Sequence, residues 1–118
     1  MGYTTIQCTG YTLTKVATED GDAAIDFTLT PGTPFKLMSV KLHMQATGGT
    51  SENLVIQQDS EDGSRYDTVL LTQDMVSVSD LFWQPDIPEQ FKAGDSIKIT
   101  YYNTNLRAWG LTVNYEVL

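Results

Sequence analysis

Apolar and polar side chains alternate along several stretches of this 118-residue chain, and that alternation limits the folds open to it. Every second side chain is apolar in residues 25–29, 97–101 and 109–117. A repeat of two residues describes a β-strand with one buried face and one solvated face. No stretch of ten or more residues shows the 3.6-residue repeat of an amphipathic helix, so we expect an all-β chain.

Residues 35–46 contain two alternating patterns that are out of phase. The apolar residues within 35–37 have one parity, and those within 40–44 have the other. A β-bulge or bend around Met38 and Ser39 would reconcile the two patterns, as happens where a strand passes from one sheet to the other.

Turn-forming residues divide the chain at intervals of roughly 8–12 residues, which is typical of a sandwich or barrel. The turns are expected at Thr9-Gly10, Glu19-Asp20-Gly21-Asp22, Pro31-Gly32-Thr33-Pro34, Thr47-Gly48-Gly49-Thr50, Ser60-Glu61-Asp62-Gly63, Gln84-Pro85-Asp86, Lys92-Ala93-Gly94-Asp95 and Asn103-Thr104-Asn105. The strands are expected at 3–8, 11–17, 23–30, 35–46, 53–59, 66–72, 76–83, 96–103 and 109–117. We therefore predict a single domain, 1–118, folded as an all-β antiparallel β-sandwich of eight or nine strands. A jelly roll is the first choice and another Greek-key sandwich the second.

Seven Lys+Arg residues against fifteen Asp+Glu residues give a net charge of −8. That charge speaks against nucleic-acid binding and against docking on anionic membranes. No apolar run exceeds three residues, so no membrane span is expected. Residues 1–5 show neither the basic nor the apolar region of a secretory signal. A single cysteine cannot form an intrachain disulfide, and we expect a protein made in a reducing cytoplasm.

The residues that usually carry catalysis are scarce, because the chain has one histidine and one cysteine. His43 lies between Lys41 and Gln45 on a polar strand face, and no partner carboxylate or nucleophile can be assigned to it from the sequence. We expect an ordinary surface or interface histidine. Cys8 has the parity of Ile6 and is expected to be a buried small hydrophobe. No catalytic, cofactor-binding or metal site is predicted, and the chain is expected not to be an enzyme.

Two acidic turns, Asp59 to Ser64 and Glu19 to Asp22, faintly resemble calcium-binding loops. Both lack the bidentate glutamate that completes such a loop, and solvated hairpin turns favour the same residue types. We therefore expect ordinary turns at both places.

Exposed aromatic side chains could form a platform for sugars, and the candidates are Trp83, Tyr102, Tyr66, Tyr3 and Tyr11. Core packing is expected instead for Trp109 and Tyr101, which share parity with apolar neighbours. Trp83 ends an apolar run before two prolines, where it could cap the sandwich, line a groove or face a partner. Packing or an interface is favoured, and the sugar platform stays open as an alternative.

The succession of segments from Phe35 to Val117 resembles small β-sandwich proteins encoded among the structural genes of tailed bacteriophages. The resemblance rests on the order of the segments 35–44, 50–56, 66–70, 81–86, 94–103 and 104–111. It covers roughly the last two thirds of the chain. No single segment is diagnostic of the family.

The resemblance implies a virion component, such as a capsid decoration (cement) protein, a head-fibre base or a tail accessory protein. It implies other virion proteins as partners, the major capsid protein among them, and a homo-oligomer such as a trimer. It brings no catalytic motif, cofactor or site residue. Residues 1–5 could form an N-terminal arm that adds a strand to a neighbour, or a frayed terminus.

The leading hypothesis is a non-enzymatic capsid decoration protein, located in the virion, that binds and reinforces the assembled capsid lattice. The alternative is a carbohydrate-binding β-sandwich, or a tail or fibre accessory protein, that contacts host glycans through a surface around Trp83.

Overall fold

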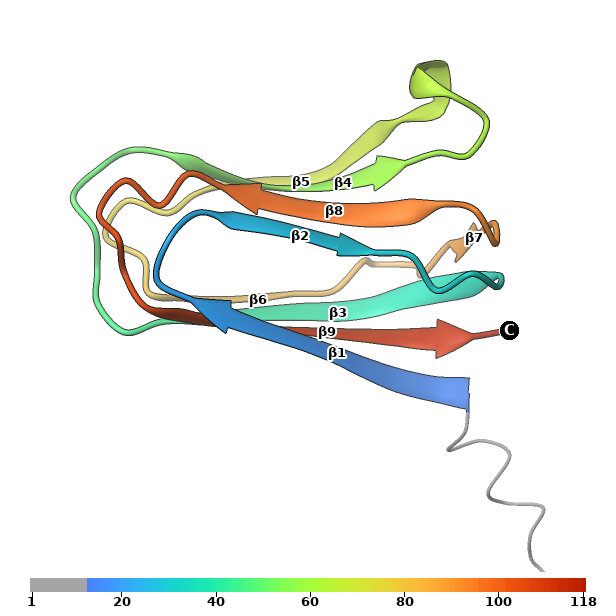
Figure 1. Cartoon of the computed structure of the whole chain (residues 1–118), viewed down its shortest axis with the longest axis horizontal. Helices are drawn as coiled ribbons and strands as arrows, with labels where there is room; N and C mark the ends of the chain where they lie inside the picture. The colour runs from blue at the N-terminus through green and yellow to red at the C-terminus, as the bar shows by residue number, and fades with distance from the viewer. Residues whose placement is uncertain (1–12) are drawn as a thin grey trace, which may run out of the picture.

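The computed structural model describes residues 13–118, which form two antiparallel β-sheets packed face to face (Figure 1). Sheet A contains, in spatial order, β1 (Thr14–Gly21), β9 (Trp109–Val117), β3 (Phe35–Met44) and β6 (Asp80–Trp83), and the short β7 (Gln90–Phe91) also pairs with β3. Sheet B contains β2 (Ile25–Leu29), β8 (Ser96–Tyr101), β4 (Asn53–Asp59) and β5 (Thr68–Asp74). A 3-10 turn, η1 (Ser64–Tyr66), lies between β4 and β5. The predicted all-β antiparallel sandwich is confirmed.

Antiparallel pairing is nested about the connection between β4 and β5. β4 pairs with β5, β3 with β6, β2 with β8, and β1 with β9. The second half of the chain therefore returns beside the first, and successive pairs alternate between sheet B and sheet A. The pairings of β3 with β9 and of β4 with β8 join these strand pairs within each sheet.

Alternation along the strands places one face of each sheet in the core, as predicted. In β2 every second residue is buried, beginning at Ile25, and β8 repeats the pattern from Ile97 to Tyr101. β9 buries alternate residues from Trp109 to Val113, whereas its last four residues are half-buried. The core therefore fills the space between the sheets, and Trp109 and Tyr101 belong to it as expected.

The bulge predicted within residues 35–46 is confirmed, but the passage of this strand from one sheet to the other, which we associated with it, does not occur. The register of β3 against β9 shifts between Leu37 and Ser39, so that Leu37 and Val40 both point into the core. β3 stays in sheet A on both sides of the shift. The extra residue corrects the parity of the strand without moving it to the other sheet.

The expected turn at Glu19 to Asp22 is also wrong, because β1 continues to Gly21. Asp20 pairs with Gly110 and Gly21 with Trp109, so the ladder to β9 extends through the acidic residues. A Cβ on Gly21 would lie 3.1 Å from the Trp109 ring. Gly21 therefore lets the indole pack against the strand, where the sequence suggested only a turn.

The expected strand at 76–83 is shorter in the structure, where β6 covers only Asp80–Trp83. Met75 is fully buried, and the N–H of Val78 donates to the Met75 carbonyl oxygen at 3.1 Å. Ser77 adopts a positive φ of 58°. A turn therefore replaces the first half of the expected strand. The expected strand at 3–8 and the possible arm at 1–5 lie outside the described residues.

Four connections gather at one end of the sandwich, on the left of Figure 1: β1–β2, β3–β4, β5–β6 and β8–β9. The buried guanidinium of Arg107 ties three of them together. Its Nη1 donates to the carbonyl oxygens of Ala46 and Val78 at 3.0 and 2.9 Å, and its Nη2 donates to the Tyr101 hydroxyl at 2.7 Å. A Cβ on Gly48 would lie 2.9 Å from the guanidinium carbon, so the backbone needs glycine there to approach.

We predict that Arg107→Lys lowers the free energy of unfolding by about 3 kcal/mol, because one ammonium group cannot replace the planar fork that serves three separate acceptors. Urea denaturation measures the loss. Arg65→Lys is the matched control, since Arg65 is exposed in η1, and it should change stability by less than about 0.5 kcal/mol. Equal midpoints for wild type and Arg107→Lys would contradict this role.

Candidate functional site

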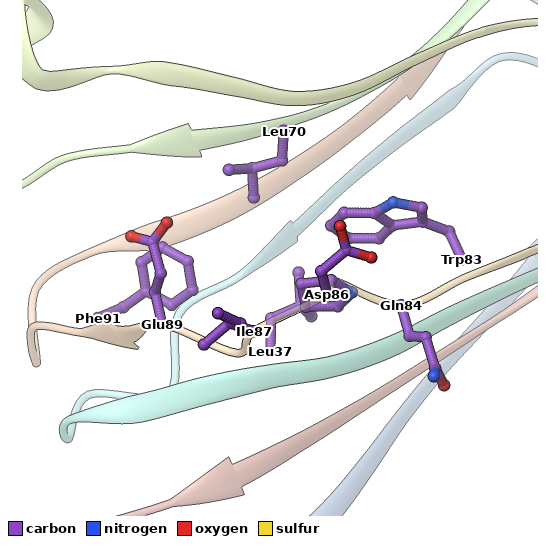
Figure 2. Close-up of a pocket in the computed structure, with 9 residues that line it drawn as sticks. Leu37, Leu70, Trp83, Gln84, Asp86, Ile87, Glu89 and Phe91 are labelled. Carbon is purple, nitrogen blue, oxygen red and sulfur yellow. The ribbon is translucent and has the colours of Figure 1, made fainter.

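A groove of about 350 Å³ opens between the two sheets, along the segment that connects β6 to β7. Its floor is apolar, because Leu37 from β3 and Phe91 from β7 are buried core residues. Leu70 from β5 and Trp83 from β6 are half-buried and form its walls. The lining residues, all drawn in Figure 2, are Leu37, Leu70, Trp83, Gln84, Pro85, Asp86, Ile87, Glu89 and Phe91.

Two prolines shape the rim of the groove. Pro85 and Pro88 lack backbone N–H groups, and each restricts the residue before it to extended conformations. β6 therefore ends at Trp83, and the chain bends at Asp86 and Ile87 before β7 begins at Gln90. Ile87 is 80 % exposed in this segment, although it is aliphatic. The local sequence thus holds an apolar side chain in solvent beside the groove.

The ionisable side chains of the groove are acidic. Asp86 and Glu89 are exposed, and the lining contains no Lys, Arg or His. In Figure 2 both carboxylates lie on the side of the segment that faces Leu70, whereas the Gln84 amide points away. Two uncompensated carboxylates favour a neutral or cationic ligand over an anion.

The groove has the features of a shallow binding site. Its volume is at the lower end of the range for small-ligand sites, which is about 300–1,000 Å³. Trp83 offers an aromatic surface for the apolar face of a ligand, and Asp86 and Glu89 offer acceptors for hydroxyl or ammonium groups. Binding of one sugar ring, or of one partner side chain, is within reach of this geometry.

The aromatic residues considered for a sugar platform do not form one surface. Tyr66 lies in η1 after the end of β4, and Tyr102 follows the end of β8. Because β4 and β8 are antiparallel, these two exposed rings lie at opposite ends of sheet B. Tyr3 and Tyr11 fall outside the described residues. Of the three candidates within residues 13–118, Trp83 alone lines the groove.

His43 is exposed on the outer face of sheet A, as expected, but it has a partner that the sequence did not reveal. Its Nδ1 is hydrogen-bonded to the Asp80 carboxylate, since β3 pairs His43 directly with Asp80 on β6. Both side chains are about two-thirds exposed, at 67 % and 70 %. Within residues 13–118, no hydroxyl is hydrogen-bonded to His43. Cys8 lies outside the described residues.

The acidic turn from Asp59 to Ser64 uses its carboxylates within the fold. Asp62 pairs with Lys92 at 2.7 Å, and the N–H of Gly94 donates to Glu61 at 3.3 Å. The hydrogen bond and charge of Asp62 raise the pKa of the Lys92 amine above its ordinary value. In the part of the chain that the structure describes, no group of three His, Cys, Asp or Glu side chains is arranged to hold a metal ion.

Asp95 is the buried acid of this region, and the sequence placed it only in a turn. Its carboxylate accepts hydrogen bonds from the N–H groups of Glu61 and Lys92, both at 2.9 Å, and from the Gln58 amide at 3.3 Å. These bonds join the turn after β4 to the turn before β8. Asp95 therefore holds together the end of the sandwich opposite Arg107.

Sequence reasoning singled out Trp83 and its prolines but missed the rest of the groove. Leu37, Leu70 and Phe91 come from three other strands, and only the tertiary fold brings them together. The usable signal was local: an aromatic strand end followed by Pro85 and Pro88, with Asp86 between them.

No protein-family model matches this chain, and no curated protein resembles it at a significant level. Among residues 13–118, no helix has the length and apolar character needed to cross a membrane. The interpretation of function therefore depends on the fold, the groove and the surfaces of this chain.

Asp74, at the end of β5, is a carboxylate whose titration the structure perturbs. The Ser51 hydroxyl donates to it, and the N–H of Val76 donates to it at 3.0 Å. These bonds, the Ser51 bond most strongly, hold the pKa of the Asp74 carboxyl below its ordinary value of 3.8. The ionised form of Asp74 therefore stabilises the turn between β5 and β6.

We predict that Asp74→Asn lowers the free energy of unfolding at pH 7 and that this deficit shrinks in acid. The folded-state pKa is depressed, so the carboxylate stabilises the fold above pH 3.8 and loses that effect as the pH falls through the folded pKa. Urea denaturation at pH 7 and at about pH 3 measures the difference. Asp86→Asn, in the groove, is the control and should leave the stability unchanged at both values. A deficit that grows in acid would contradict the assignment.

Proposed function

We propose that this chain is a non-enzymatic structural protein of a tailed-bacteriophage virion, of the capsid decoration type. The observation that carries the proposal is the strand order, β1-β9-β3-β6 in one sheet and β2-β8-β4-β5 in the other. This nested order favours a jelly roll, an architecture common among viral capsid and lectin domains. It adds to the resemblance of residues 35–117 to small virion sandwiches.

In this proposal the chain binds the assembled capsid lattice, with the major capsid protein as its main partner. A subunit that binds the lattice but not free capsid protein stabilises the lattice by mass action. No cofactor takes part, and the chain acts as a homo-oligomer on the virion after synthesis in the host cytoplasm. The net charge of −8 supports an outer location, since an acidic protein is repelled by packaged DNA.

The outer faces of both sheets offer polar surface for such contacts. One row across sheet A consists of Thr18, Thr112, Lys41 and Phe82, with Phe82 61 % exposed. A polar surface with a few exposed aromatics is typical of interfaces that form after the subunit has folded.

The test is co-sedimentation with DNA-free capsids of the phage whose genome encodes this chain. We expect saturable, stoichiometric binding and a higher thermal transition of the loaded capsids, because ligand binding stabilises the bound state. An equal amount of heat-unfolded chain is the control for protein that is carried into the capsid pellet without specific binding. Absence of saturable binding would overturn the decoration function and direct attention to the tail and fibres.

A second candidate function, carbohydrate binding by a tail or fibre accessory protein, is favoured by the groove. Trp83 supplies an aromatic surface there, with Asp86 and Glu89 as polar neighbours. Sugars commonly stack their apolar face on an aromatic ring and hydrogen-bond to carboxylates and amides around it.

For this candidate we predict that glycan binding, measured on an array of host surface glycans, is lost in Trp83→Ala and weakened in Asp86→Asn. Tyr102→Ala removes an exposed aromatic outside the groove and should bind as the wild type does. Because Trp83 packs partly against the core, Asp86→Asn serves as the variant that keeps the fold. Binding that survives both groove variants would exclude the groove as the sugar site.

A further inference from the structure

In residues 13–118 five strands lie at the edges of the two sheets, and four of them are poor templates for another strand. β7, β6 and β2 have only two, four and five residues. β5 is interrupted, because its register against β4 shifts between Ile56 and Gln57. Short and bulged edges are devices by which proteins avoid edge-to-edge pairing. The exception is β1.

β1 is long, regular and exposed. Its eight residues pair with β9 from Thr14 to Gly21 without a register shift, and no strand of the described chain pairs with its other edge. Figure 1 shows β1 at the margin of sheet A. Ala17 is its one half-buried residue, and Val16 is 59 % exposed. An edge of this kind presents a row of backbone N–H and C=O groups that a further strand can satisfy.

The sequence of β1 is complementary to itself in one antiparallel register. When Ala17 lies opposite Ala17 of a second copy, Lys15 lies opposite Glu19, and symmetry repeats this pair. On the other face Val16 then meets Thr18, and Thr14 meets Asp20. Directly opposed residues of opposite charge, and β-branched pairs, stabilise antiparallel strands. All these residues except Ala17 are exposed in the single chain.

Neighbouring registers lose this complementarity. A slip of two residues places Lys15 opposite Gly21 or Ala17, so its charge has no partner. A slip of four residues places Lys15 opposite Lys15, or Glu19 opposite Glu19, and like charges directly opposed are destabilising. The strand sequence therefore specifies the register centred on Ala17.

Lys15 and Glu19 have the parity of Ala17, whose partner Val113 is in the core, so they stand on the inward-facing side of β1. Inward-pointing charges usually protect an edge from foreign strands. In the register centred on Ala17, each charge meets its opposite on a second copy of the same strand. The two residues thus admit self-pairing while they discourage other pairing.

We propose that two copies of this chain pair through β1, antiparallel and with Ala17 at the two-fold axis, so that sheet A continues from one copy into the other. Such an isologous contact is the commonest symmetry of homo-oligomers. The proposal stands apart from the virion function and from the trimer implied by the phage resemblance, because β1 pairing makes a closed dimer.

Sedimentation equilibrium over a concentration series tests the charge pairs. We expect Lys15→Glu and Glu19→Lys each to weaken dimerisation at least about tenfold, because each substitution acts twice in a symmetric dimer. The double variant, Lys15→Glu with Glu19→Lys, should restore it. Lys41→Glu on β3 is the control for Lys15→Glu, because it makes the same change in net charge away from β1. It should dimerise as the wild type does. Circular dichroism checks that each variant is folded.

Disulfide trapping tests the register directly. In a Cys8→Ser background, Ala17→Cys places two thiols on directly opposed residues, where Cα atoms are about 4.5–5.5 Å apart, and oxidised glutathione should link them. Thr14→Cys is the control, since its two copies would lie six residues apart along the strands, or about 20 Å. The linked Ala17→Cys protein should have twice the 13.1 kDa mass of one chain.

Four results would overturn the proposal. They are a wild-type chain that stays monomeric at every concentration, a trimer, dimerisation unaffected by Lys15→Glu, and equal cross-linking at Thr14 and Ala17. Dimerisation through β1 without binding to capsids or glycans would support the dimer proposal and would contradict only the proposed function.

Discussion

Burial of one face of each sheet against the other is the constraint on which the rest of this structure depends. Every strand of the core must present its apolar residues to the same side, and where the chain falls out of phase, as at Leu37 and Ser39, a bulge restores the parity. The nested pairing of the strands then brings the four connections at one end and the turns at the other into two compact groups.

Polar groups buried at the two ends hold these connections in place. Arg107 joins three connections at one end through carbonyl oxygens and the Tyr101 hydroxyl. Asp95 joins two turns at the other end through backbone N–H groups. Neither forms an ion pair in the described chain, and each hydrogen-bonds to backbone groups of the connections that it joins. Polar residues thus close a sandwich whose centre is apolar.

The groove and the free edge of β1 lie at opposite edges of sheet A, because β6, beside the groove, and β1 are its two outer strands. Pairing through β1 would leave the groove beside Trp83 open in both copies. A dimer of this kind would present two copies of one weak site, and linked sites bind a repeating surface far more tightly than single ones. A capsid lattice and a glycan-coated cell are both repeating surfaces.

The sequence alone determined the all-β class, the antiparallel sandwich, the inward parity of the strands and the bulge near Ser39, because these follow from a local period of two. It could not reveal that β1 runs through the acidic residues to Gly21, since that depends on the Trp109 ring lying against this glycine. It also could not bring Asp80 to His43, or Leu37, Leu70 and Phe91 to Trp83. Those contacts join residues far apart in the chain, and only the order of the strands in the two sheets decides them.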